Sequence, residues 1–296
     1  MSTGLLLAIL FQDVLQFRVD VRRVHVDVFV TRDGASVGDL GAKNFEVYDD
    51  GKRQDVELVD VASIPQTFAL LLDESGSISG GKRELLQEAA LDFARRLRAE
   101  DELAVLSFAE RISLRRPLRL HPSEIEESAY EIRGGGWTAL NDALSLTMTY
   151  LRNAQGRPIL LVFSDGMDNA SWIGEEAVLQ AARADEVVVY AVRADVGEHL
   201  SQTGSALSPG GTSGPSSAML DELAKLTGGR SLAAARTGEI AETFQEILSE
   251  VSARYLLVFS PAENNNPGWH ELRVRIRGAG NVAVRARTGY YAPPKD

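Results

Sequence analysis

The sequence predicts an α/β fold, in which a doubly wound, mainly parallel sheet is inserted into a small β-sandwich-like domain built from both chain ends. Two observations support this fold class. Short apolar runs such as Phe68–Leu72 and Ile159–Phe163 alternate with helical patterns through the middle of the chain. Both flanks instead alternate apolar and polar residues, as half-buried strands do. Because each flank is small for a core of its own, we expect the two flanks to pair.

The change of pattern sets the expected domain boundaries. Residues 17–64 and 254–292 form the predicted β-rich domain, and residues 66–252 form the α/β domain. Residues 1–16 are expected to be a leader or signal remnant, because their apolar run is too short to cross a bilayer as a helix. Residues 199–217, rich in Gly and Ser, are expected to be a flexible loop.

The flanks contain strands separated by turn residues. The valines between Val24 and Val30 occupy every second position, which indicates a strand. Asp50-Gly51 lies between two alternating runs, 44–48 and 55–59, and predicts that they form a hairpin. The expected strands of the second flank are 255–259, 270–277 and 282–286.

Between the flanks, strands and helices alternate with the spacing of a parallel sheet covered on both faces. The predicted strands are the run ending at Asp73, then 104–108, 112–118, 157–163, 187–192 and 231–232. The predicted helices are 82–100, 123–132, 139–153, 175–184, 220–227 and 239–251. Ser123 and Glu126 have capping-box spacing at the start of the second helix.

Polar turns follow two of the buried strands. Asp73, Ser75 and Ser77 follow the first strand, and Asp165 follows the strand 157–163. Thr138 lies on a glycine-rich loop between them. Loops at the carboxyl ends of strands converge at the switch point of a doubly wound sheet, where ligands bind. Because the donors are carboxylates and hydroxyls, they suit an octahedral hard cation with one coordination position open.

These five positions resemble the metal-ion-dependent adhesion site of von Willebrand factor type A domains. The family pattern is Asp-x-Ser-x-Ser on a first loop, Thr on a second and Asp on a third. The resemblance covers the predicted α/β domain and implies a Rossmann-like fold. It implies that Ser75, Ser77 and Thr138 bind Mg²⁺ (or Mn²⁺ or Ca²⁺) directly or nearly so, and that Asp73 and Asp165 bind it directly or through water. It also implies a protein partner that offers a carboxylate to the metal.

The flanks extend the resemblance to nearly the whole chain. Asn44–Gly51 and Arg285–Pro293 are similar to the two ends of bacterial, acidobacterial-type proteins related to von Willebrand factor type A domains.

Composition narrows the possible functions. The net charge of -11 argues against a nucleic-acid partner, because phosphate binding needs a basic surface. No segment reads as transmembrane, and the absence of cysteine excludes thiolate sites and disulfides. Gly76–Gly80 is similar to a nucleophile elbow, but Ile78 stands where serine is required. The four histidines lie outside the strand-end motifs, so no base for Ser75 or Ser77 is evident.

We therefore expect a non-catalytic, cation-dependent protein-binding or adhesion module, secreted or located in the periplasm or cell envelope. One alternative is a metal-dependent phosphohydrolase, since an acid at a strand end can hold Mg²⁺. Another is a structural envelope protein with a vestigial metal site. Oligomeric state does not follow from the sequence.

Several residues beside the motifs have simpler interpretations. Glu74 is expected to be a solvated loop residue rather than a ligand, and Asp168 and Asn169 are expected to cap the following helix. Trp137 either contacts a partner or packs under its own loop. Tyr290 and Tyr291 are expected in the core or at the rim of the β domain.

Overall fold

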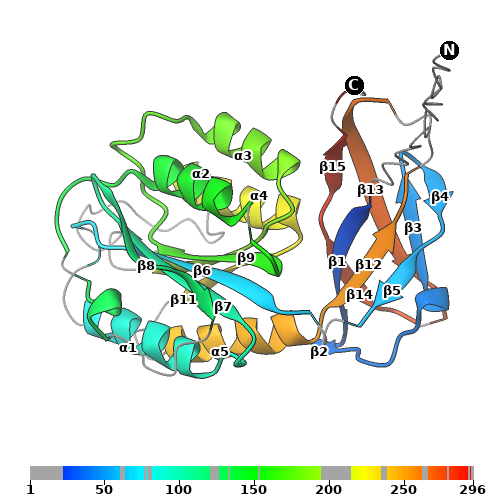
Figure 1. Ribbon diagram of the computed structural model, residues 1–296, viewed down its shortest axis with the longest axis horizontal. Helices are drawn as coiled ribbons and strands as arrows, with labels where there is room; N and C mark the ends of the chain where they lie inside the picture. Colours follow the sequence, from blue (N-terminus) through cyan, green and yellow to red (C-terminus); the bar gives the residue numbers. More distant parts are fainter. Residues whose placement is uncertain are drawn as a thin grey trace, which may run out of the picture.

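The computed structural model contains an α/β unit and a β unit (Figure 1). It describes residues 23–60, 64–76, 78, 82–120, 127–132, 134–152, 154–194, 215–234, 239–261, 266–278, 280–292 and 294. The predicted leader 1–16, Ser77, the capping pair Ser123 and Glu126, and most of the predicted loop 199–217 lie outside these residues. No helix of the described residues is long and apolar enough to span a membrane.

The α/β unit is built on a six-stranded sheet. Its strands are β6 (Gln66–Asp73), β7 (Glu102–Phe108), β8 (Ile112–Leu120), β9 (Arg157–Ser164), β10 (Val188–Ala194) and β11 (Arg230–Ala234). Their order is β11-β10-β9-β6-β7-β8, and all neighbours are parallel except the edge strand β8, which runs antiparallel to β7. The predicted doubly wound, mainly parallel sheet is confirmed.

Helices cover both faces of this sheet (Figure 1). They are α1 (Lys82–Arg95), α2 (Leu140–Leu151), α3 (Glu175–Ala184), α4 (Pro215–Thr227) and α5 (Glu239–Ser252). Alternate residues of β6 point to opposite faces, so Leu70 packs in the core under α1 and α5, and Leu71 in the core under α2, α3 and α4. Burial on both faces explains why these strands read as continuous apolar runs.

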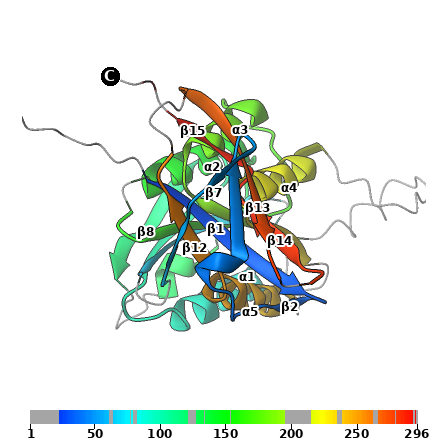
Figure 2. The same cartoon turned by 90° about the vertical axis from the view of Figure 1, so that its right-hand side faces the viewer.

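The β unit consists of two antiparallel sheets that share one core (Figure 2). Its strands are β1 (Val24–Arg32), β2 (Ala35–Ser36), β3 (Phe45–Asp49), β4 (Lys52–Gln54), β5 (Glu57–Val59), β12 (Tyr255–Phe259), β13 (Gly268–Ile276), β14 (Ala283–Ala286) and β15 (Gly289–Ala292). One sheet has the order β14-β1-β12-β5, with β2 beside β1, and the other has the order β15-β13-β3-β4. Both flanks of the chain therefore contribute strands to each sheet.

The predicted hairpin between 44–48 and 55–59 is wrong in its second strand. Across the turn, β3 pairs with β4, whereas β5 pairs with β12 in the other sheet. Asp50 and Gly51 form the expected tight turn, with φ values of 47° and 79°. The chain crosses between sheets at 55–56, a switch that alternation of side chains does not encode.

Three helix predictions need correction. The first helix ends at Arg95 rather than 100, because the Asp101 carboxylate accepts hydrogen bonds from the Arg98 and Gln66 amides and draws the chain into the next strand. Helix α4 begins at Pro215, within the tract expected to be a loop. In the region 123–132, the described part forms a short 3-10 helix, Glu127–Tyr130.

The topology places a switch point at the ends of β6 and β9. From β6 the chain passes through α1 to β7 on one side, whereas β9 lies on the other side of β6 and continues into α3. Because α1 and α3 cover opposite faces, the loops after β6 and β9 diverge. Such a switch point is where open α/β sheets bind ligands.

Candidate metal centre

Asp73 is the last residue of β6 and its side chain is fully buried. Its Oδ1 accepts a hydrogen bond from the Ser75 amide at 2.9 Å, and its Oδ2 accepts one from the Ser164 hydroxyl at 2.6 Å. Burial raises the pKa of Asp73 to about 6, against the opposing effect of these hydrogen bonds, and the charge of Asp165 raises it further. Among the described residues, no cationic side chain contributes to this shift. A bound cation would offset this cost of burying the charge.

The loop after β6 is tied directly to the glycine-rich loop. Ser75 is fully buried, and its side chain hydrogen-bonds to Asp73. The next residue, Gly76, donates from its amide to the Gly136 carbonyl at 3.2 Å, and Gly135 donates to the Glu74 carbonyl at 2.8 Å. A side chain at Gly135 or Gly136 would be strained, because their φ values are 129° and 85°.

Thr138 connects the second loop to the third. Thr138 is 3% exposed, and its amide donates to Asn169 Oδ1 at 2.7 Å. Its carbonyl accepts from the amides of Asn169 and Ala170 at 2.9 and 3.0 Å. The backbone of Thr138 is therefore held on both sides by the loop that begins with Asp165.

Asp165 follows β9 and is half-buried. Its Oδ1 accepts from the Met167 amide at 3.0 Å, and its charge acts on Asp73. The structure thus gathers Asp73, Ser75, Thr138 and Asp165 on three hydrogen-bonded loops at one edge of the sheet. Ser77, the fifth predicted donor, lies outside the described residues.

The donor chemistry fits a hard divalent cation. Two carboxylates and hydroxyl groups are the oxygen ligands that Mg²⁺ takes in proteins. The raised pKa of Asp73 indicates that burial disfavours its charged carboxylate, which a nearby positive charge would stabilise. The residues that would hold the ion are Asp73, Ser75, Ser77, Thr138 and Asp165.

Two supporting residues are not evident from the sequence. Ser164 belongs to β9 and donates its hydroxyl to Asp73, a residue 91 positions away. Asn169 supplies the side-chain oxygen that fixes the Thr138 amide. Serine and asparagine are common in turns, so neither residue type signals these long-range contacts.

The prediction that Asp168 and Asn169 cap the following helix is wrong. Asp168 Oδ2 accepts from the Asn141 amide at 2.8 Å, so it caps the preceding helix, α2. The following helix, α3, has Gly174 at its N-cap. Sequence adjacency favours the following helix, whereas the fold brings the start of α2 beside this loop.

Glu74 is not the solvated residue that the sequence predicts. Its side chain is 12% exposed and forms an ion pair with Arg115 of β8 at 3.0 Å. It also accepts a hydrogen bond from the Ser107 hydroxyl at 3.0 Å. Glu74 therefore fastens the first loop to the strands beside it.

Exposed apolar side chains lie on two of the loops that carry the donors. Trp137 is 61% exposed, so it does not pack under its own loop. Met167 and Trp172, on the loop between β9 and α3, are 46% and 96% exposed. The loops that carry Thr138 and Asp165 thus present large apolar groups to solvent.

Comparison with known proteins identifies the α/β unit. Residues 68–167 match the model of the von Willebrand factor type A domain family. Inter-alpha-trypsin inhibitor heavy chain H4 of Sus scrofa is 28% identical over 102 residues, which cover 33% of this chain and 11% of that protein. The chain thus spans about a tenth of the length of this relative.

Solved structures share the fold at low sequence identity. A von Willebrand factor type A protein from Catenulispora acidiphila aligns with a TM-score of 0.53 and 12% identity, covering 94% of this chain and 76% of that one. The D319A mutant of the PilB minor pilin from Streptococcus sanguinis aligns with a TM-score of 0.50 and 9% identity, covering 64% and 62% of the two chains.

The fold and its strand-end loops define a doubly wound α/β domain with oxygen donors at the switch point. This unit is a von Willebrand factor type A domain. Domains of this family typically mediate protein–protein interaction and are often metal-dependent.

Proposed function

We propose that this protein is a non-catalytic adhesion module that binds a protein partner through a divalent cation. Asp73, Ser75, Ser77, Thr138 and Asp165 hold the ion, Mg²⁺ in the first instance, and an acidic residue of the partner completes the coordination. The observation that carries this proposal is the buried Asp73 carboxylate, which lies close to Asp165 and has no cationic contributor to its pKa among the described residues.

The net negative charge of the chain explains why a cation would be needed to bind an acidic partner. The net charge of -11 repels an acidic partner at long range. When bound, the cation supplies a local positive charge that attracts a carboxylate. The protein residues orient this site, since Ser164 positions Asp73 and Asn169 positions Thr138.

The surface around the site supports a macromolecular partner. Trp137, Met167 and Trp172 are exposed on the two loops that carry Thr138 and Asp165. Aromatic residues and methionine are enriched in protein–protein interfaces. A carboxylate flanked by apolar side chains is therefore the partner surface that fits best.

The positions of the histidines support a non-catalytic role. His25 and His270 lie on strands of the β unit, and His121 and His199 lie outside the described residues. In the part of the chain that the structure describes, no imidazole accompanies Ser75 as a general base.

The test is a pull-down from cell-envelope extract, because we propose that the protein is secreted or works at the envelope. Mg²⁺ should permit capture of a partner, chelator should release it, and Asp73→Ala should abolish capture. The matched control is Asp92→Ala, which removes an acid of α1 that pairs with Arg96. Equal capture by Asp73→Ala, or capture that persists in chelator, would refute the proposal.

Asp73→Ala and the wild type also distinguish the binding module from a phosphohydrolase and from a structural protein. Turnover of phosphoesters that depends on Mg²⁺ and is lost in Asp73→Ala would replace the binding proposal with a phosphohydrolase. Absence of Mg²⁺ binding by the wild-type chain would favour a structural protein with a vestigial site.

A further inference from the structure

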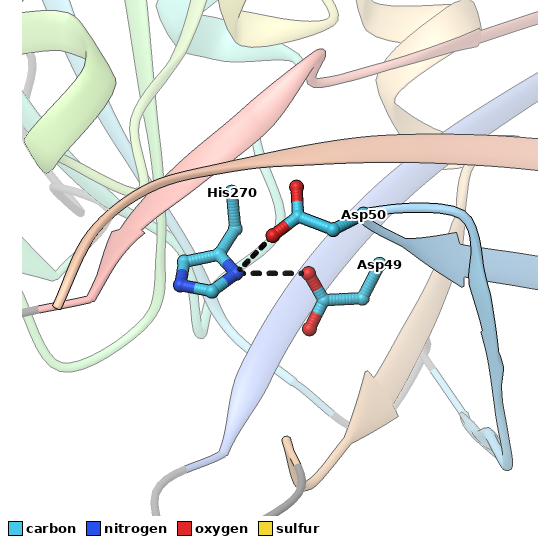
Figure 3. A group of neighbouring side chains, drawn as sticks. All are labelled: Asp49, Asp50 and His270. Atoms are coloured by element: carbon cyan, nitrogen blue, oxygen red, sulfur yellow. Dashed lines mark ion pairs between the residues drawn. The ribbon is translucent and has the colours of Figure 1, made fainter. Parts of the chain in front are cut away.

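A second group of metal-ligating side chains lies in the β unit (Figure 3). Asp49 ends β3, Asp50 begins the turn to β4, and His270 lies on β13, the antiparallel neighbour of β3. One ligand atom from each residue lies within 4.8 Å of the other two. Two strands and a tight turn therefore bring together three candidate ligands from the two flanks of the chain.

Each acid already uses one carboxylate oxygen. Asp49 Oδ2 accepts a hydrogen bond from the Tyr290 hydroxyl at 2.9 Å. Asp50 Oδ1 accepts one from the Glu271 amide at 2.9 Å. The second oxygens, Asp49 Oδ1 and Asp50 Oδ2, are directed toward His270 (Figure 3).

The imidazole of His270 is likewise held by a hydrogen bond at one of its two nitrogens. His270 Nε2 lies 2.7 Å from the Asn266 carbonyl, and because a carbonyl can only accept, Nε2 carries the hydrogen. In the neutral ring this leaves a lone pair on Nδ1, which faces the two carboxylates. The Tyr290 ring stacks on the imidazole with centroids 5.1 Å apart and an interplanar angle of 19°, which holds the plane of the ring.

The distances within the group suit a shared ion. His270 Nδ1 lies 3.2 Å from Asp49 Oδ1 and 2.8 Å from Asp50 Oδ2. Around an ion with bonds of about 2.1 Å, neighbouring ligands lie about 3.0 Å apart in octahedral geometry and about 3.4 Å apart in tetrahedral geometry. The observed separations thus correspond to adjacent positions in one coordination shell.

Hydrogen bonding does not account for these contacts. The side chains of His270 and Asp49 are 5% and 4% exposed. Within the described part of the chain, neither His270 Nδ1 nor Asp49 Oδ1 has a hydrogen-bond partner, despite their proximity. Buried polar atoms without a partner are costly and rare. A neutral His270 would leave Nδ1 and Asp49 Oδ1 in this state, and a metal ion that binds both atoms removes the cost.

We propose that Asp49, Asp50 and His270 bind a divalent transition-metal ion such as Zn²⁺ or Mn²⁺, which fastens the β3–β4 turn to β13. One imidazole and two carboxylates suit these ions, whereas the site in the α/β unit offers oxygen donors alone. The Asp50 side chain is 50% exposed, so the ion can enter from solvent and keep water ligands on that side. Tyr290 and the Asn266 carbonyl orient the ligands, as outer-shell partners do in metal sites.

The test is calorimetric titration of the full chain with Zn²⁺, in excess Mg²⁺ so that the oxygen-donor site is occupied. The wild-type chain should bind one Zn²⁺ and show a raised Tm. Asp50→Asn should weaken binding at least about tenfold, Tyr290→Phe about tenfold, and His270→Gln should abolish it.

The turn between β1 and β2 offers a matched control. Asp33 and Gly34 have φ values of 51° and 84°, close to those of Asp50 and Gly51. Asparagine tolerates this conformation, so Asp33→Asn and Asp50→Asn perturb equivalent turns, and only the second removes a ligand. Asp33→Asn should bind Zn²⁺ as the wild type does.

Three results would overturn the proposal: no saturable Zn²⁺ or Mn²⁺ binding by the wild type, wild-type affinity in Asp50→Asn, or equal losses in Asp33→Asn and Asp50→Asn. If His270→Gln does not fold, Asp50→Asn and Tyr290→Phe decide the outcome, because the first keeps the turn and the second keeps the stacked ring.

Discussion

Asp73 and Glu250 are buried carboxylates whose pKa values shift in opposite directions. Burial raises the pKa of Asp73 to about 6. Burial would also raise that of Glu250, but the hydrogen bond from Arg285 and the charge of Arg254 outweigh it and hold the pKa below its usual range. At the residue scale, an acid with cationic partners serves structure, whereas one without them is suited to bind a cation.

The raised pKa of Asp73 predicts an unusual pH dependence. Between about pH 4 and pH 6, in chelator, the folded state retains a proton at Asp73 that the unfolded state has lost, so the contribution of Asp73 to stability falls as pH rises. Asp73→Asn should therefore raise the free energy of unfolding above pH 6 by up to about 3 kcal/mol. Urea denaturation with and without Mg²⁺ measures the free energy of unfolding of both chains. A difference between Asp73→Asn and the wild type that does not vary with pH would contradict this prediction.

At the scale of elements, α2 and the loop after β9 are joined by hydrogen bonds in both directions. Asp168 accepts from the Asn141 amide in the first turn of α2. In return, Asp142 of that turn accepts from the amides of Trp172 and Ile173. This reciprocal capping fixes the loop that carries Asp165 against the helix that follows Thr138.

Loss of this cap should affect both stability and metal binding. Asp168→Ala should lower the free energy of unfolding by about 1–2 kcal/mol, because it leaves the Asn141 amide without its acceptor. Mg²⁺ affinity should also fall as the loops separate. Glu175→Ala, in the first turn of α3, is the control and should leave Mg²⁺ affinity unchanged. An Asp168→Ala chain with wild-type stability would contradict the capping role.

Most elements follow from local pattern, and the exceptions have distant causes. The run 157–163 predicts β9, and the helix 175–184 has its predicted bounds, since their patterns need no tertiary information. The end of α1 depends on Asp101, and β5 pairs with a strand from the other flank. The supporting roles of Ser164 and Asn169 likewise depend on loops far apart in sequence.

At the scale of the whole molecule, a buried polar network joins the two units. Arg254, which is 1% exposed, donates to the Tyr190 hydroxyl at 2.9 Å, and that hydroxyl donates to Glu250 at 2.7 Å. Arg285 of β14 pairs with Glu250, and Arg157 of β9 pairs with Asp27 of β1. These contacts link the sheet of the α/β unit to both flanks of the chain.

Neutralising Glu250 should destabilise both units together. Glu250→Gln leaves Arg254 and Arg285 without their anion, which should cost about 3–5 kcal/mol. The lowered pKa of Glu250 means that its contribution is present above its unfolded pKa and is lost as pH falls through the folded value. The loss relative to wild type should therefore shrink in acid. Calorimetric unfolding measures this loss of stability, and Glu246→Gln, at an exposed acid, is the control. Two separate unfolding transitions in the wild type would contradict coupling of the two units.

We expect the cation site on the loops after β6 and β9 to be independent of the site in the β unit. Titration calorimetry of Mg²⁺ into the wild type, Asp73→Ala and His270→Gln tests it most directly. The wild type and His270→Gln should bind one Mg²⁺ with equal affinity, and Asp73→Ala should not bind it. Mg²⁺ affinity that is unchanged in Asp73→Ala would contradict the account.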